Sequence, residues 1–152
     1  MVRTLAIGDI HGGLKGLRQA LQKAMVSKDD LLVFLGDYVD GWSESAQTVE
    51  FLINLSKKHN CIFIRGNHDE LVYDWLRTNE LNDLWLNHGG RGTITSYESI
   101  DDQQKTAHLE FFKNLKDYYI DDQNRMFVHA GFQNHNGPEH EHHKTAFYWD
   151  RT

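Results

Sequence analysis

Two short stretches combine carboxylate and imidazole side chains at spacings that suit a metal ion. "GDIHG" at 8–12 holds Asp9 and His11, and "GDYVDG" at 36–41 holds Asp37. Asp9 and His11 are two positions apart, so in an extended loop both side chains can point the same way and hold one cation. Asp37 has two carboxylate oxygens and could bridge that ion to a second one. The chemistry to look for is therefore that of a metal centre.

Two further stretches add ligands of the same kind. "GNHD" at 66–69 offers the amide oxygen of Asn67, and "VHAG" at 128–131 offers the imidazole of His129. A mixed oxygen and nitrogen set suits manganese, iron or zinc better than a cysteine-rich structural zinc site. Two such ions about 3.5–4 Å apart would clamp the attacking and leaving oxygens of a phosphoryl displacement and lower the pKa of a bound water.

Each of the four stretches follows an apolar run of strand length. The runs lie in "TLAIGD", "LLVFLGD", "CIFIRGNHD" and "RMFVHAGF", and patterns of helical spacing follow the first three. Strands that alternate with helices of this length predict βαβ units and a mainly parallel sheet. Loops beyond the carboxyl ends of such strands converge on one crevice, so we expect the four stretches to meet.

The organisation along the chain predicts one α/β domain over residues 1–152. A helical insertion is expected from about residue 79 to 117, broken at "NHGGRG", and a long hydrophilic loop holds Pro138. Cys61 lies within an apolar run, which favours buried packing over a reactive thiol.

Composition excludes some partners. The net charge is −6 and the sixteen basic residues are scattered, which argues against a nucleic-acid-binding surface. No apolar stretch reaches the roughly 20 residues of a membrane helix, and no secretory signal is recognisable at the start. We expect a cytoplasmic protein that acts on a phosphorylated protein or a small phosphoester.

The ordered set "GDIHG", "GDYVDG", "RGNHDE" and "VHAG" resembles the calcineurin-like metallophosphoesterases. Within them it is similar to the PPP-type serine/threonine protein phosphatases of the bacterial and bacteriophage lambda kind. The resemblance spans nearly the whole chain and implies an α/β/β/α sandwich around a mainly parallel βαβαβ core.

The resemblance also implies two metal ions that share one ligand, with manganese favoured and iron or zinc as alternatives. The first would be held by Asp9, His11 and Asp37, and the second by Asp37, Asn67 and His129.

Catalytic and phosphate-binding roles follow from the same resemblance. It implies that His68 protonates the leaving oxygen and that Asp40 orients His68. A carboxylate beside an imidazole raises its pKa and fixes its tautomer, which suits a general acid. Arg65 would bind phosphate oxygens as a bidentate guanidinium. Arg151, in "YWDRT", would be a second phosphate contact.

The chain departs from the family pattern in two places. Gly41 stands where the family has an arginine after the second aspartate of "GDxxD", and Trp42 follows it. The family's further histidine ligand, from a downstream Gly-His-Thr segment, has no counterpart before Thr152. We therefore expect a carboxy-terminally truncated domain with an incomplete second sheet.

Other polar residues have simpler interpretations. Taken singly, Asp40 or Asn67 would more often be a turn or helix-cap residue than a functional one. His88 is expected at a helix terminus. His140, His142 and His143 are expected in a solvated loop, with adventitious metal binding as the alternative.

The sequence thus favours hydrolysis of phosphate monoesters, as in a serine/threonine protein phosphatase, by attack of a hydroxide that bridges two metals. The alternatives are a bis(5'-nucleosyl)-tetraphosphatase or a phosphodiesterase, since one metal core can serve them all. A base-stacking pocket would favour the nucleotide substrate and an open groove a peptide. A non-catalytic metal-binding fragment is the alternative from another class.

Overall fold

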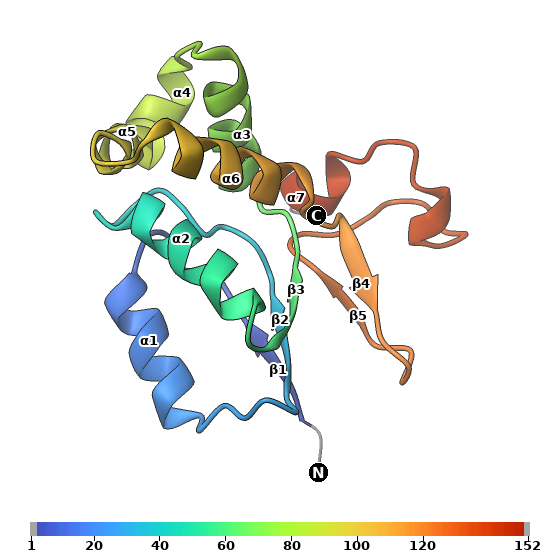
Figure 1. The fold of residues 1–152 in the computed structure, drawn as a ribbon. Coiled ribbons are helices and arrows are strands. Elements are labelled where there is room, and N and C mark those ends of the chain that lie inside the picture. Colours follow the sequence, from blue (N-terminus) through green and yellow to red (C-terminus); the bar gives the residue numbers. More distant parts are fainter. Residues whose placement is uncertain (1–2, 151–152) are drawn as a thin grey trace.

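A three-stranded parallel sheet forms the centre of the computed structural model, which describes residues 3–150 (Figure 1). Its strands are β1 (Thr4–Ile7), β2 (Leu31–Phe34) and β3 (Asn60–Phe63), in that spatial order. The central strand β2 is buried along most of its length, which explains its uninterrupted apolar sequence. The predicted parallel α/β core is confirmed.

The register brings the three strands to an end at one edge of the sheet. Ile7 pairs with Phe34, and Phe34 pairs with Phe63. The residues that follow each strand therefore leave the sheet side by side. This places the loops that carry Asp9, Asp37 and Asn67 next to one another, as expected for parallel strands.

Two helices cover one side of this sheet. Figure 1 shows α1 (Leu14–Lys23) and α2 (Ser45–Ser56) on the same side, with the last part of the chain, in orange and red, on the other. Successive parallel strands in the order 1-2-3 require crossovers of one hand, so both connecting helices fall on one face. Leu17 of α1 and Leu52 of α2 are buried there against the core that contains Leu32 and Phe34.

A group of helices lies beyond the edge of the sheet where the strands end. They are α3 (Asn67–Thr78), α4 (Asp83–Trp85), the π-helical turn η1 (Leu86–Gly90), α5 (Arg91–Tyr97) and α6 (Asp102–Lys113). The predicted insertion at 79–117 is thus mainly helical. Its backbone is kinked at His88 and Gly89, where the dihedral angles are not helical.

The fourth apolar run does not join the parallel sheet, contrary to expectation. It forms β5 (Met126–Val128), which pairs antiparallel with β4 (Tyr118–Ile120). The two strands are joined by a short turn, which suffices for an antiparallel pair, whereas a parallel strand needs a long crossover. The sequence analysis missed β4, and without it β5 resembled another strand of the main sheet.

A backbone link ties this hairpin to the parallel sheet. Lys116 N–H donates to Phe63 O at 2.9 Å, and Arg65 N–H donates to Lys116 O at 2.8 Å. The chain after α6 thus runs alongside the end of β3 before it enters β4. The remaining short elements, η2 (Pro138–His140) and α7 (Ala146–Trp149), follow the hairpin.

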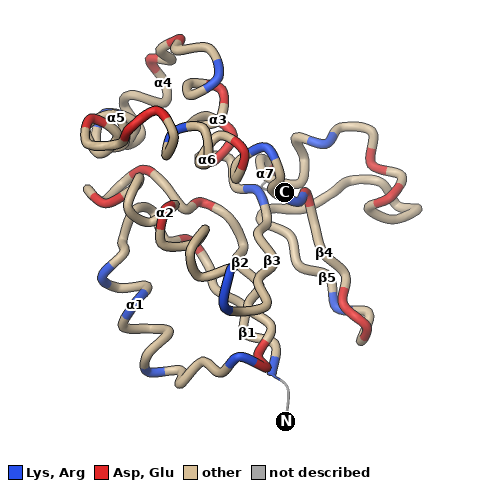
Figure 2. The backbone as a smooth tube through the Cα atoms, viewed as in Figure 1, with Lys and Arg blue, Asp and Glu red and all other residues tan. Residues whose placement is uncertain are grey.

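Charged residues are dispersed over the fold. Figure 2 shows Lys and Arg spread over several elements instead of gathered on one. In the part of the chain that the structure describes, no helix is long and apolar enough to cross a membrane.

The fold predicts a stability effect at Tyr38, which is fully buried and donates its hydroxyl hydrogen bond to Ile64 O at 2.6 Å. Tyr38→Phe leaves that buried carbonyl without this donor, so we expect a loss of about 1–3 kcal/mol in the free energy of unfolding. Denaturant unfolding of the metal-free protein measures it. Tyr119→Phe, on the hairpin, is the control, and equal effects of the two substitutions would contradict the prediction.

Candidate metal and phosphoester site

Asp37 occupies the centre of the cluster, with its two carboxylate oxygens in different surroundings. Oδ1 accepts a hydrogen bond from the backbone N–H of His68 at 3.0 Å. Oδ2 lies 3.7 Å from His11 Nε2 and 3.5 Å from His129 Nε2. One oxygen is therefore fixed by the protein, while the other lies between two imidazoles. Oδ2 is therefore the oxygen of Asp37 that faces both predicted metal positions, and its bridging role stays a prediction.

Backbone carbonyls orient both imidazoles toward Asp37. The Nδ1 atom of His11 lies 3.1 Å from Val39 O, and that of His129 lies 2.8 Å from Leu35 O. Because a carbonyl only accepts hydrogen bonds, each Nδ1 carries a proton, and Nε2 is the ring nitrogen that faces Asp37. Metal-binding histidines are held in this way in many proteins.

The other two predicted ligands complete the cluster. Asn67 Oδ1 lies 3.2 Å from His129 Nε2, and Asp9 Oδ2 lies 3.9 Å from His11 Nε2. Ligand atoms of Asp9, Asp37 and His129 all fall within 4.8 Å of one another. The structure therefore brings together all five residues predicted as ligands. Carboxylate, amide and imidazole atoms converge, a donor set that fits divalent transition metals.

A carboxylate that the sequence analysis did not consider holds the loops of this site. Asp69 is fully buried and accepts hydrogen bonds from the backbone N–H groups of Asp37 (2.8 Å), Tyr38 (2.9 Å) and Gly66 (2.8 Å). Burial and the charge of Asp37 raise the pKa of Asp69, and these three bonds oppose the rise. An acidic residue in the first turn of a predicted helix was the available signal.

Gly66 explains why the stretch "GNHD" begins with glycine. A Cβ atom at this position would lie 2.2 Å from Asp37 Oδ1 and 2.3 Å from Asp37 N. The two loops therefore approach each other more closely than any side chain permits. This contact fixes the separation between Asp37 and Asn67.

His68 and Asp40 form a hydrogen-bonded pair beside the metal cluster. His68 Nδ1 lies 2.7 Å from Asp40 Oδ2, and since a carboxylate only accepts, Nδ1 donates. Burial by itself lowers the pKa of His68. The hydrogen bond to Asp40 and the negative charges of Asp37, Asp40 and Asp69 outweigh burial and raise it. Ligand atoms of His68, His11 and Asp37, one from each, also fall within 4.8 Å of one another, so His68 lies close to the candidate metal ligands.

Asp40 is enclosed by donors that the sequence analysis missed. Its carboxylate is fully buried and also accepts hydrogen bonds from the Trp85 indole N–H at 2.8 Å and the Thr93 hydroxyl at 2.5 Å. Both residues belong to the helical insertion, about 50 positions further along the chain. No local sequence signal connects them to Asp40.

The two residues predicted to bind phosphate are Arg65 and Arg151. Arg65 forms an ion pair with Glu70, and its guanidinium also lies 3.5 Å from Leu115 O. Its phosphate contact stays a prediction. Arg151 lies outside the described residues. Gly41 offers no side chain to the site, and the neighbouring Trp42 is 71% exposed.

The remaining histidines include His88, which lines a small cavity together with Asn67 and His68. His88 is at the kink of η1, with Nδ1 2.6 Å from Leu84 O, which agrees with its expected place at a helix terminus. Over residues 3–150, the groups of His, Cys, Asp and Glu that could hold a metal do not include His140, His142 or His143.

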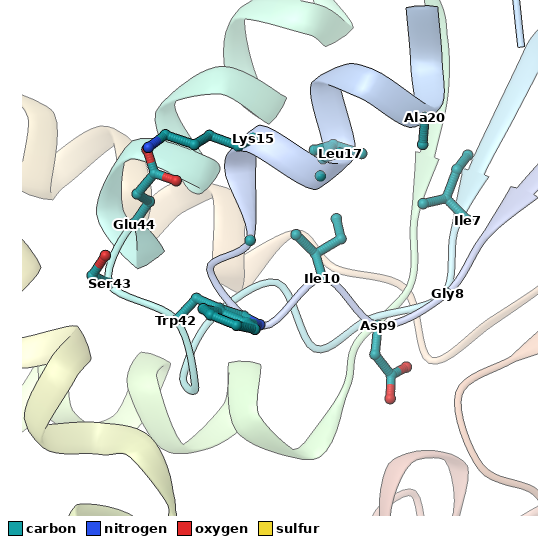
Figure 3. A pocket seen from close by; sticks show the side chains of 12 residues that line it. Ile7, Gly8, Asp9, Ile10, Lys15, Leu17, Ala20, Trp42, Ser43 and Glu44 are labelled. Atoms are coloured by element: carbon teal, nitrogen blue, oxygen red, sulfur yellow. The ribbon is translucent and has the colours of Figure 1, made fainter. Parts of the chain in front are cut away.

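Two cavities flank the metal loops. A cavity of about 300 Å³ is lined by His68, Asn67, Leu71 and Trp149, among others. A larger one of about 660 Å³ lies between the β1–α1 loop and α1, with Trp42 on its wall (Figure 3). Asp9, a predicted metal ligand, also lines this cavity, and in Figure 3 its carboxylate points away from Leu17.

The fold and the cluster are those of a metallophosphoesterase. The sequence model of the calcineurin-like phosphoesterase family matches residues 2–149, and the chain belongs to this family.

Several bis(5'-nucleosyl)-tetraphosphatases are similar to this chain at 25–28% identity. A bis(5'-nucleosyl)-tetraphosphatase PrpE [asymmetrical] from Anoxybacillus flavithermus is 26% identical over 141 residues, covering 84% of this chain and 56% of the relative. A symmetrical bis(5'-nucleosyl)-tetraphosphatase from Pseudomonas putida is 28% identical over 131 residues, covering 84% of this chain and 42% of the relative. The chain thus spans about half the length of these proteins.

Solved structures share the fold. A candidate diadenosine tetraphosphatase superposes with a TM-score of 0.70 at 21% identity, covering 96% of this chain and 61% of the other. A serine/threonine phosphatase from Saccharomyces cerevisiae gives a TM-score of 0.59 at 18% identity, covering 88% of this chain and 42% of the other.

The geometry predicts that Asp37 contributes to both metal positions. Asp37→Asn removes the charge between His11 and His129, so we expect metal affinity to fall at both positions by at least tenfold, consistent with the loss of about 1.4 kcal/mol or more. Isothermal titration with Mn²⁺ measures this. Asp29→Asn, outside the cluster, is the control. Retention of two ions with unchanged affinity would refute the shared role.

Proposed function

We propose that this chain carries the catalytic core of a metal-dependent hydrolase that cleaves dinucleoside tetraphosphates. The observation that carries the hydrolase proposal is the convergence of four ligand-type residues around Asp37, with His68 beside them. The substrate proposal is supported by the named relatives from Anoxybacillus flavithermus and Pseudomonas putida.

The proposed cofactors are two divalent ions, with manganese favoured. Asp9, His11 and Asp37 would hold one, and Asp37, Asn67 and His129 the other. When bound, such ions supply Lewis acidity and a water of lowered pKa. The low-charge amide and imidazole ligands suit a transition metal better than Ca²⁺, which prefers an all-oxygen set.

His68 is the proposed general acid. Its Nδ1–H is committed to Asp40, so the other ring nitrogen can deliver a proton to the leaving oxygen. In the overall reaction one water adds to a phosphorus atom, one P–O–P linkage breaks and two nucleotides are released. Asp40 stabilises the charged imidazole and keeps it in one tautomer.

Replacement of His68 separates an enzyme from a non-catalytic metal-binding fragment. We expect His68→Ala to lower kcat by roughly 100-fold to 10,000-fold on an alkyl phosphate because the general acid is lost. Metal content by elemental analysis stays at the wild-type value. His142→Ala, in an exposed loop, is the control. Unchanged hydrolysis in His68→Ala would refute the assigned acid.

Trp42 is the residue on which one nucleobase of the substrate is proposed to stack. Trp42 directly follows Gly41, the position at which the family resemblance implies a phosphate-binding arginine. Its backbone N–H donates to His11 O at 2.8 Å, so a metal ligand and this exposed indole belong to one connected loop pair. An exposed indole beside an apolar cavity can stack on a base.

Substitution of Trp42 distinguishes nucleotides from simpler phosphoesters. We expect Trp42→Ala to raise KM for diadenosine tetraphosphate roughly 5-fold to 150-fold, the equivalent of about 1–3 kcal/mol of stacking. KM for p-nitrophenyl phosphate changes little. Trp149→Ala is the matched variant in the smaller cavity. If only Trp149→Ala raised KM for diadenosine tetraphosphate, the base would be assigned to that smaller cavity instead of to Trp42.

A second candidate function, hydrolysis of phosphoserine or phosphothreonine, is favoured by the His68–Asp40 pair. A serine or threonine alkoxide is a poor leaving group and needs a proton, whereas a nucleotide phosphate leaves more readily without one. Comparison of kcat/KM for a phosphoserine peptide and diadenosine tetraphosphate decides between the two substrates.

A further inference from the structure

We propose that Thr93 and Trp85 are positioning residues, which hold Asp40 so that His68 presents its proton to the leaving oxygen. The inference rests on the proposed role of His68 as general acid. It extends that role from a pair of residues to a segment, 85–93, that lies in the helical insertion.

Two hydrogen bonds from this segment fix the carboxylate of Asp40. Thr93 Oγ1 donates to Oδ1 at 2.5 Å, and Trp85 Nε1 donates to Oδ2 at 2.8 Å. Oδ2 is also the oxygen that accepts the His68 Nδ1–H, at 2.7 Å. With both oxygens occupied, the carboxylate plane cannot rotate, and the imidazole that it binds has one orientation.

The backbone of Asp40 is fixed by the same neighbours. Its N–H donates to Thr93 Oγ1 at 3.1 Å and to Ser45 Oγ at 3.0 Å. Asp40 has a φ of +67°, a left-handed conformation that is uncommon for a residue with a side chain. Such a conformation persists where its surroundings hold it, and it occurs often at functional sites. Thr93 thus contacts both the backbone and the side chain of Asp40.

The turn between Trp85 and Thr93 packs directly on Asp40. A Cβ atom at Gly89 would lie 2.9 Å from Asp40 Cβ and 2.7 Å from Gly41 N, and Gly89 itself has a φ of +111°. The kink in η1 is therefore the point where the insertion closes over Asp40. Asp40, Trp85 and Thr93 are all fully buried, so water does not replace these donors.

Loss of a hydrogen-bond donor from this segment would affect catalysis through the orientation of Asp40 and His68. A buried carboxylate that loses one donor carries a desolvation cost and turns toward the donors that are left. That movement carries the His68 ring with it, because the two are joined by a short charged hydrogen bond. Second-layer contacts of this kind affect catalysis when they set the direction of a proton.

The test uses Thr93→Val, which keeps the shape and removes the hydroxyl, and Thr93→Ser, which restores it. We expect Thr93→Val to lower kcat on β-glycerophosphate, an alkyl ester, roughly 10-fold to 100-fold. On p-nitrophenyl phosphate, whose leaving group needs no proton, kcat falls much less. Thr93→Ser stays close to the wild type on both, and Trp85→Phe behaves like Thr93→Val. Thermal unfolding and metal content are recorded for each variant.

A spectroscopic measurement tests the same contacts without turnover. In metal-free protein, the ¹H and ¹⁵N signals of the His68 Nδ1–H report its bond to Asp40. We expect Thr93→Val and Trp85→Phe to shift or broaden these signals and Thr93→Ser to preserve them. His108, whose Nδ1 lies 3.0 Å from the Tyr97 hydroxyl oxygen, is the internal reference.

Two results would overturn the inference. One is an equal loss on both esters in Thr93→Val, with the His68 signals unchanged, which would make the segment a structural anchor only. The other is a wild-type spectrum in which His68 Nδ1 carries no proton. Absence of hydrolysis of every phosphoester by the metal-loaded wild type would instead refute the proposed function, and the His68 signals would still decide the positioning role.

Discussion

The buried carboxylate of Asp69 is the contact on which the site depends. It binds three backbone N–H groups, two from the loop after β2 and one from the loop before α3. These donors would otherwise be buried without partners, at a cost of about 1–3 kcal/mol each. With Asp69 in place, the two loops can approach closely enough for Gly66 to lie against Asp37. The distance between Asp37 and Asn67 follows from this contact.

Near Asp69, backbone carbonyls and a carboxylate orient the imidazole side chains of the site. Leu35 and Val39 carbonyls direct His129 and His11 toward Asp37. Asp40 does the same for His68, but it is a charged group and needs donors of its own. The hydroxyl of Thr93 and the indole of Trp85 meet that need. The proposed metal ligands and the proposed general acid are thus held by separate sets of contacts that meet beyond the carboxyl end of β2.

The elements contribute to the site in different ways. The parallel strands end in one row, which places the three loops that follow them side by side. The hairpin β4–β5 brings His129 from outside that sheet, through a backbone link to β3. The helical insertion closes over Asp40 and supplies two of its donors. Three separate parts of the chain therefore converge on a cluster only a few ångströms wide.

The sequence by itself determined the parallel βαβ core, the mainly helical character of the insertion and the four residues that gather around Asp37. Local patterns sufficed there because apolar runs, helical spacing and polar residues at strand ends are all short-range features. Only the tertiary structure decided that β5 pairs with β4, that Asp69 joins two loops, and that Trp85 and Thr93 enclose Asp40. These contacts join residues 31–53 positions apart or depend on an unexpected strand, and which distant partners meet is set by packing of the whole chain, not by local pattern.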